Sequence, residues 1–179
     1  MPALKKGYNP IMKPLTLSSL DLDALPPVTI VPLWLNLSED ALGQPVQLPI
    51  LAARGPQPSP VVGLTAALHG DEVNGLPVIH QLFQNLDPQS LAGTLIGVII
   101  ANIPAFRELR RRFPDETDLN HVMPGTAGDN VSKDYAHRLF DLVVSRFDYL
   151  FDLHTASRGR INSLYIRANM DDPTVADMA

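Results

Sequence analysis

The chain has 179 residues, enough for one domain that buries roughly two thirds of the surface exposed by its unfolded form. Hydrophobic residues make up 45% and charged residues 18%, which excludes the low-hydrophobicity, high-charge profile of disordered chains. The formal net charge of −5 argues against a nucleic-acid partner, and the lack of cysteine excludes disulfides and thiolate metal ligands.

The N-terminus shows no pattern for export or membrane insertion. Lys5 and Lys6 resemble the basic start of a signal peptide, but Gly7-Tyr8-Asn9-Pro10 follows where an apolar region is required. No apolar run approaches the length that spans a membrane. We therefore expect a cytoplasmic protein without a membrane partner.

The first third of the chain predicts an arm followed by strands. Residues 1–27 are rich in Pro, Lys and Ser without a sustained period, which is typical of an N-terminal arm. Two short strands at 28–35 and 46–51, separated by turn residues, favour an antiparallel pair. A turn at 55–58 precedes a continuous apolar run at 61–68, the pattern of a strand covered on both faces.

Helices and strands then alternate. Apolar residues at three- and four-residue spacing predict helices over 72–85 and 132–146. Apolar runs at 95–101 and 147–153 predict two more buried strands. This alternation predicts an α/β domain over 28–179, with a mainly parallel or mixed central sheet and flanking helices.

Three polar residues directly follow predicted strands. They are His69, Asn102 and His154, which are far apart in the sequence. Ligands collect outside the carboxyl ends of the strands in sheets of this class. We therefore expect these side chains to meet at one rim of the sheet.

A metal site is predicted at that rim. His69 and Glu72 stand three residues apart at a strand-to-helix turn, and His154 supplies the third ligand that a catalytic zinc site needs besides an open position for water. Asp118 and Asp152 are available to accept hydrogen bonds from the other ring nitrogens. A His-x-x-Glu pair alone is common in proteins without metal, so the strand-end position carries the prediction of one Zn²⁺.

Two other histidines have a simpler interpretation. His80 and His137 lie within the two predicted helices, beside apolar residues. Both are expected to be half-buried packing residues without a chemical role.

Four short segments follow one another in a fixed order: Ala67-Leu68-His69-Gly70-Asp71-Glu72, Ala101-Asn102-Ile103-Pro104-Ala105-Phe106, Asp118-Leu119-Asn120-His121 with Met123-Pro124-Gly125, and Asp152-Leu153-His154-Thr155. Together, over about residues 60–170, they resemble the succinylglutamate desuccinylase/aspartoacylase family, relatives of the zinc carboxypeptidases. The resemblance implies a zinc carboxypeptidase-like fold, one zinc held by His69, Glu72 and His154, and hydrolysis of an N-acyl amide or ester of a small carboxylate-bearing molecule.

The resemblance also implies substrate-binding residues. Asn120 and an arginine just upstream would bind the substrate's carboxylate or polarise its carbonyl. Arg112 is chosen as that arginine, with Arg111 as an alternative, because a guanidinium pairs two-pronged with a carboxylate. A solvated basic face over 110–112 is the other interpretation. His121 stands where the family usually has arginine and is only partly charged at neutral pH, so it predicts a different substrate anchor.

The general base departs from the family pattern. The family places a glutamate in a later strand, whereas no glutamate follows Glu116 here. The resemblance therefore implies a general-base glutamate beyond Ala179 and an incomplete catalytic domain whose C-terminal part is missing. Asp171, Asp172 and Asp177 lie in a polar tail typical of a helix start or linker rather than of a catalytic base.

The end of the chain predicts an open sheet edge. A strand-like pattern at 163–167 comes shortly before the last residue. A sheet that lacks its further strands keeps an unpaired apolar edge, which favours association. The 179-residue chain is therefore expected to be poorly soluble or homo-oligomeric and to bind zinc with little hydrolysis.

Two rival functions remain beside the deacylase. One is a zinc carboxypeptidase-like peptidase, whose pocket accepts a peptide C-terminus rather than an acylated amino acid. The other is a non-catalytic zinc or small-molecule binding domain, consistent with the lack of a base and with His121.

Overall fold

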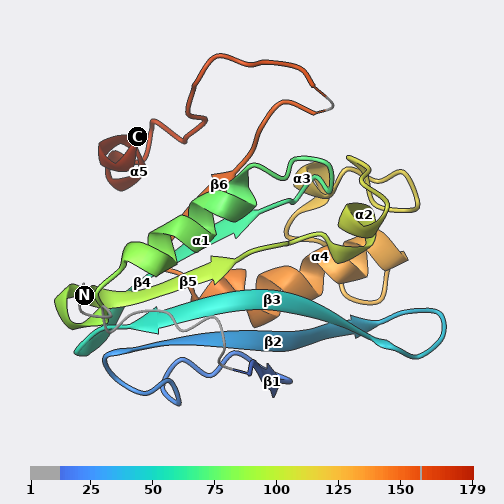
Figure 1. Ribbon diagram of the computed structural model, residues 1–179. Coiled ribbons are helices and arrows are strands. Elements are labelled where there is room, and N and C mark those ends of the chain that lie inside the picture. The colour runs from blue at the N-terminus through green and yellow to red at the C-terminus, as the bar shows by residue number, and fades with distance from the viewer. Residues whose placement is uncertain (1–12, 158) are drawn as a thin grey trace.

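The computed structural model describes residues 13–157 and 159–179. A six-stranded sheet in the order β1-β2-β3-β5-β4-β6 forms its centre (Figure 1). Among the described strands, β3 alone runs against its neighbours, and the others share one direction. The predicted α/β class with a mainly parallel or mixed sheet is thereby confirmed. The strands are β1 (Leu15–Leu17), β2 (Thr29–Glu39), β3 (Pro45–Arg54), β4 (Gln57–Ala66), β5 (Ala92–Val98) and β6 (Tyr149–Leu153).

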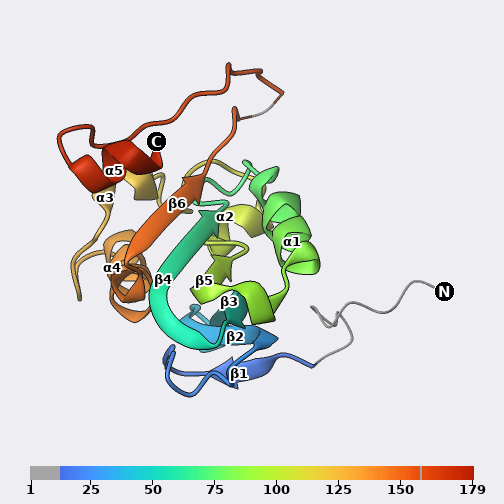
Figure 2. The same cartoon turned by 90° about the vertical axis from the view of Figure 1, so that its left-hand side faces the viewer.

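Helices cover both faces of this sheet. Figure 2 looks along the strands and shows α1 and α4 on opposite sides. Two short helices, α2 and α3, lie near the carboxyl ends of the parallel strands, and α5 follows a long loop that arches away from the sheet (Figure 1). No helix in the described part of the chain is long and apolar enough to cross a membrane. The α-helices are α1 (Gly75–Asn85), α2 (Ile103–Arg107), α3 (Leu119–Val122), α4 (Val131–Leu142) and α5 (Pro173–Met178).

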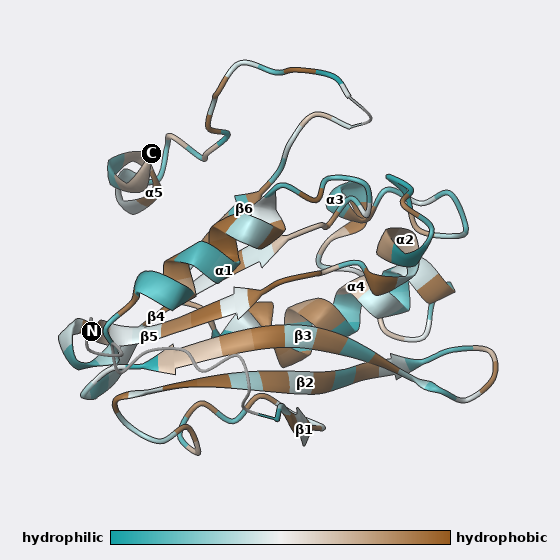
Figure 3. Ribbon diagram, viewed as in Figure 1, coloured by the Kyte–Doolittle hydropathy of each residue, from teal (hydrophilic) through white to brown (hydrophobic). Residues whose placement is uncertain are grey.

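Two hydrophobic clusters hold the layers together. On one face Ile79 and Phe83 of α1 are fully buried in the same cluster as Leu64 of β4. On the other face Leu139 of α4 shares a cluster with Leu35 of β2. The apolar bands of α1 and the strands are visible in Figure 3, where polar colours mark the outer surface of the helix. Burial of these apolar surfaces is the main force that fixes the sheet and hence the positions of its strand ends.

Most predicted elements are confirmed with shifted ends. The predicted antiparallel pair forms between β2 and β3. The helix predicted over 72–85 begins at Gly75, and the helix predicted over 132–146 ends at Leu142, after which a short 3-10 helix spans Val144–Arg146. The turn predicted at 55–58 is wrong in extent, because β4 already begins at Gln57 and its register with β5 shifts between Gln57 and Val61.

The strand predicted as buried at 147–153 is placed differently. β6 begins at Tyr149 and forms an edge of the sheet, with β4 as its only neighbour among the described strands. Leu150 is 41% exposed and Phe151 is 42% exposed. The strand-like pattern at 163–167 forms no strand in the structure. An apolar pattern indicates which side chains favour burial, but it does not predict whether a neighbouring strand is present to cover them.

The described part of the predicted arm, residues 13–27, packs on the sheet. β1 pairs in parallel with β2, and Leu20 and Leu25 are buried. Arg54 of β3 holds this segment, since its Nη1 donates to the carbonyl oxygens of Leu25 at 2.6 Å and Asp23 at 3.0 Å. Residues 1–12 of the predicted arm lie outside the described residues.

Candidate metal centre

The loop after β4 carries His69. Ala67, directly after the strand, takes a left-handed backbone with φ of 52°. Asn102, which follows β5 and is fully buried, holds this loop: its backbone N–H donates to the carbonyl of Ala67 at 3.1 Å and its Nδ2 to the carbonyl of Leu68 at 3.0 Å. Asn102 thus stands at the predicted rim, but its side chain fixes the loop that presents His69.

A tight turn brings Glu72 back to His69. The Glu72 N–H donates to the carbonyl oxygen of His69 at 3.0 Å. Gly70 lies between them against the backbone of α2, where a Cβ atom would come 2.2 Å from the carbonyl carbon of Ala105. Glycine is therefore required for close approach of the two chains, which keeps both ligand candidates at the strand end.

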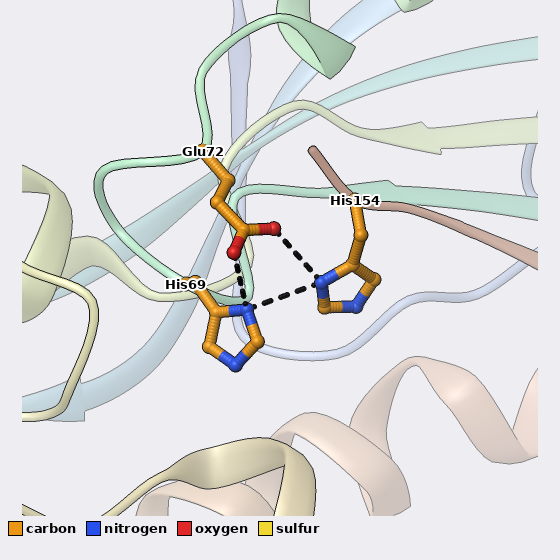
Figure 4. A group of neighbouring side chains, drawn as sticks. All are labelled: His69, Glu72 and His154. Carbon is orange, nitrogen blue, oxygen red and sulfur yellow. Dashed lines mark hydrogen bonds and ion pairs between the residues drawn. The ribbon is translucent and has the colours of Figure 1, made fainter. Parts of the chain in front are cut away.

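His69, Glu72 and His154 converge on one point (Figure 4). Their ligand atoms lie within 4.8 Å of one another. The two Nδ1 atoms are 3.1 Å apart. Glu72 places Oε1 3.0 Å from Nδ1 of His69 and Oε2 3.0 Å from Nδ1 of His154. Residues 85 positions apart in the sequence are thus brought together by the parallel pairing of β4 and β6.

An aspartate contacts the opposite nitrogen of each ring. Nε2 of His69 lies 3.0 Å from Oδ1 of Asp118, and Nε2 of His154 lies 2.6 Å from Oδ2 of Asp152. A carboxylate on one ring nitrogen fixes the orientation of the imidazole and leaves the other nitrogen for a metal. Both Nδ1 atoms therefore face the centre of the group.

Glu72 is surrounded by donors, of which Arg111 was named from the sequence only as the alternative substrate arginine. Its Oε1 accepts from Arg111 Nη1 at 2.9 Å and from Ser157 Oγ at 3.0 Å. Its Oε2 accepts from the backbone N–H of Thr155 at 3.0 Å. Thr155 belongs to the quoted segment Asp152-Leu153-His154-Thr155, but nothing in the sequence assigns it a contact, and no sequence signal points to Ser157.

The donor set fits Zn²⁺. Two imidazole nitrogens and a carboxylate oxygen are common zinc ligands, and bonds of about 2.0–2.1 Å in tetrahedral geometry place ligand atoms about 3.3 Å apart. The separations of 3.0–3.1 Å between the nitrogen and oxygen atoms are close to that value. His69 and Glu72 are buried, and the side chain of His154 is 33% exposed, so the group opens to solvent on one side.

The charges of the group are set by these contacts. Burial alone would raise the pKa of Glu72, but hydrogen bonds from His154, His69 and the Thr155 N–H hold it well below its ordinary range, so Glu72 is ionised. The hydrogen bond to Asp152, followed by that to Glu72, raises the pKa of His154 from 6.5 to about 10. In the metal-free chain His154 is therefore protonated at neutral pH. Its stabilising contribution is complete below pH 6.5 and is lost as the pH rises through about 10.

We expect zinc affinity to rise with pH, because His154 must release its proton before Nδ1 can bind a metal. The raised pKa of His154, about 10, predicts an increase of about tenfold per pH unit between pH 6.5 and 8.5 from this group. Competition with a chelator of known affinity at several pH values measures it. Asp152→Asn removes the largest cause of the raised pKa and should flatten the dependence; an equal slope in both proteins would contradict this origin.

The structure distinguishes the two candidate arginines. Arg111 contacts Glu72, and its Nη2 lies 3.3 Å from Oδ2 of Asp118. Arg112, the residue chosen from the sequence, is exposed and makes no described hydrogen bond to the cluster of His69, Glu72 and His154. Arg110 pairs with Glu108 and Glu116 at the surface, so the basic run is divided between a solvated face and the cluster.

The two other predicted substrate residues lie on α3. The backbone N–H of Asn120 donates to Oδ1 of Asp118 at 3.1 Å. The same oxygen contacts Nε2 of His69. Asn120 also lines, with Asp152, a cavity of about 350 Å³. His121 is exposed on the same short helix. His80 and His137 lie half-buried in α1 and α4, as predicted.

Comparisons with known proteins identify the family of this chain. The family model of the succinylglutamate desuccinylase/aspartoacylase catalytic domain matches residues 58–179. The N-alpha-acetyl-L-2,4-diaminobutyric acid deacetylase of Halomonas elongata is 31% identical over 115 residues, which are 63% of this chain and 33% of that protein.

Solved structures agree with this match. A succinylglutamate desuccinylase/aspartoacylase from Rhodobacter sphaeroides superposes with a TM-score of 0.63 at 28% identity, over 72% of this chain and 40% of that chain. The product-bound ectoine utilization protein EutE from Ruegeria pomeroyi gives 0.60 at 29% identity, over 70% and 40%. The chain thus spans about one third of the curated relative and about 40% of these solved chains. The matched segment contains β4 from its second residue, β5, β6 and every residue of the cluster, and the chain belongs to the succinylglutamate desuccinylase/aspartoacylase family.

Proposed function

We propose that His69, Glu72 and His154 hold one Zn²⁺, and that this chain forms the metal centre of a deacylase. The substrate would be an N-acyl amide, or an ester, of a small carboxylate-bearing molecule. The observation that carries the proposal is the pair of Nδ1 atoms and the Glu72 carboxylate around one point, with an aspartate behind each ring. The relative from Halomonas elongata supports the substrate class, since its name specifies an N-acetylated amino acid.

Bound zinc in such a site lowers the pKa of a water molecule and polarises a carbonyl oxygen. The residues of this chain contribute position and charge. Asp118 and Asp152 hold the two imidazoles with Nδ1 toward the centre, and Glu72 supplies the negative charge. Arg111, whose side chain is 42% exposed beside the cluster, would pair with a substrate carboxylate, and Asn120 lies on the adjoining turn.

The two aspartate carboxylates beside the cluster already make hydrogen bonds or ion pairs with other side chains. Asp118 contacts His69 and Arg111, and Asp152 contacts His154 and Thr65. A general base needs a free approach to the proton that it removes. The proposal therefore assigns the metal centre and substrate anchors to this chain and assigns no general base within it.

The test is a hydrolysis assay of the zinc-loaded chain. N-acetyl and N-succinyl amino acids are offered beside short peptides, and the released acid or amine is quantified. We expect zinc-dependent turnover of the acylated amino acids, about 10²–10⁴ times slower than by a relative with a positioned base, because that is the contribution of general-base catalysis.

The other outcomes identify the rival functions. Preferential cleavage of peptides would indicate a carboxypeptidase-like peptidase. Zinc binding with ligand binding, but without any turnover, would indicate a non-catalytic binding domain. Full activity would show that a residue already present acts as the base. His80→Ala, in a helix outside the cluster, serves as the unchanged control.

A further inference from the structure

We infer that Thr65 is a positioning residue for the metal centre, which orients His154 through Asp152. The inference rests on the proposed zinc site. Thr65 belongs to β4 and lies directly opposite Asp152 in the register with β6. Its Oγ1 donates to Oδ1 of Asp152 at 2.6 Å, and Oδ2 of Asp152 lies 2.6 Å from Nε2 of His154. The carboxylate of Asp152 thus links Thr65 of β4 to His154, the most exposed of the three ligands.

His154 needs such support more than His69 does. His69 is almost completely buried on a loop that Asn102 ties down. His154 leaves an edge strand, is 33% exposed, and has no strand beyond it among the described residues. Asp152, also on β6, is itself partly exposed, so its carboxylate could rotate unless its second oxygen is held. The hydroxyl of Thr65 holds that oxygen.

The chemistry of Thr65 suits this task. It is 5% exposed and is the only buried polar side chain of β4. Because threonine is branched at Cβ, its χ1 is stiff, so the hydroxyl oxygen has a fixed position from which it donates to Asp152. Valine would fill the same space without a buried hydroxyl to satisfy, so the packing of this strand alone does not require threonine.

A neighbouring threonine provides a matched control. Thr94 lies on the adjacent strand β5 and is also buried, and its hydroxyl donates to the carbonyl oxygen of Pro58 at 2.7 Å, a bond unrelated to the cluster. Thr65→Val and Thr94→Val therefore remove the same group from the same sheet, and only the first change affects the path to His154.

The experiment measures zinc dissociation constants by chelator competition for the 179-residue chain and its variants, together with the visible spectrum of the Co²⁺-loaded forms. We expect Thr65→Val to weaken zinc binding about threefold to tenfold and to alter the Co²⁺ spectrum, less than the 10- to 100-fold typical of groups that contact a ligand directly. Thr65→Ser, which keeps the hydroxyl, should stay within about twofold of the parent, and Thr94→Val should leave the affinity unchanged.

Repeating the Thr65→Val change in a variant without the Asp152 carboxylate tests whether Thr65 acts through Asp152 or through the stability of the sheet. In Asp152→Ala there is no carboxylate to hold, so adding Thr65→Val should cause no further loss of affinity. Equal affinity of Thr65→Val and the parent, equal loss in Thr65→Ser, or an additive loss in the Asp152→Ala background would each overturn the inference. If Thr65→Val does not fold, Thr65→Ala enters the same comparison. Failure of the parent chain to bind zinc would instead refute the metal centre itself.

Discussion

Replacement of His154 or His69 by alanine is expected to lower zinc affinity by about 10²–10³-fold. Sites with four ligands bind zinc with about 10–16 kcal/mol, so each ligand contributes about 2.5–4 kcal/mol, which corresponds to that factor. Glu72→Gln should also weaken binding, because a neutral amide replaces the ionised carboxylate that contacts both imidazoles. Elemental analysis after dialysis and chelator competition measure the change.

Two controls make this result specific. His80→Ala and His137→Ala remove histidines of the helices α1 and α4 and should leave the metal content unchanged. His154→Ala is the more informative ligand variant, because His154 is partly exposed and its truncation leaves a smaller internal cavity than truncation of buried His69. Unaltered zinc stoichiometry in both His69→Ala and His154→Ala would refute the assignment.

The convergence of these residues could be predicted because it depends on simple rules of α/β sheets. Continuous apolar runs identified the central strands β4 and β5, and the rule that parallel strands end at one rim placed His69 beside His154. The neighbours of Glu72 could not be predicted in this way. Ser157 and the Thr155 N–H reach the carboxylate through the turn after β6, whose course depends on local backbone geometry.

The position of β6 shows what an apolar pattern lacks. The run at 147–153 is apolar except for Asp148 and Asp152, yet Leu150 and Phe151 remain partly exposed at the sheet edge. Burial of a strand requires a partner on each side, and the sequence of one strand contains no information about its neighbours. This difference affects the site, because His154 stands on that edge and is the ligand most open to solvent.

The choice between Arg111 and Arg112 illustrates a further limit. Adjacent residues after a short helix differ in direction, and spacing to a motif does not resolve a difference of one position. In the structure Arg111 donates hydrogen bonds to Glu72 and Asp118, whereas Arg112 makes no described hydrogen bond to the cluster. The substrate-binding role that the resemblance implies is therefore now proposed for Arg111.

Replacement of Arg111 by alanine should weaken the binding of carboxylate-bearing ligands by about 10- to 100-fold, since a hydrogen bond to a charged group contributes about 1.5–3 kcal/mol. The affinity for the matching neutral ligand should change little. Zinc binding should not weaken, because the variant removes a cation that competes for Oε1 of Glu72. Calorimetric titration of the zinc-loaded chain with an N-acetyl amino acid and with its amide measures both effects.

Arg112→Ala is the matched control. It removes an arginine side chain at the next position, which is exposed and makes no described hydrogen bond to the cluster. Its affinity for both ligands should equal that of the parent. Arg111→Lys should recover only part of the loss, since an ammonium group pairs with a carboxylate as a point charge and lacks the planar fork of arginine. A loss in Arg112→Ala with full affinity in Arg111→Ala would return the role to Arg112. Equal losses for the carboxylate ligand and its amide would show that the guanidinium orders the cluster and does not bind the substrate.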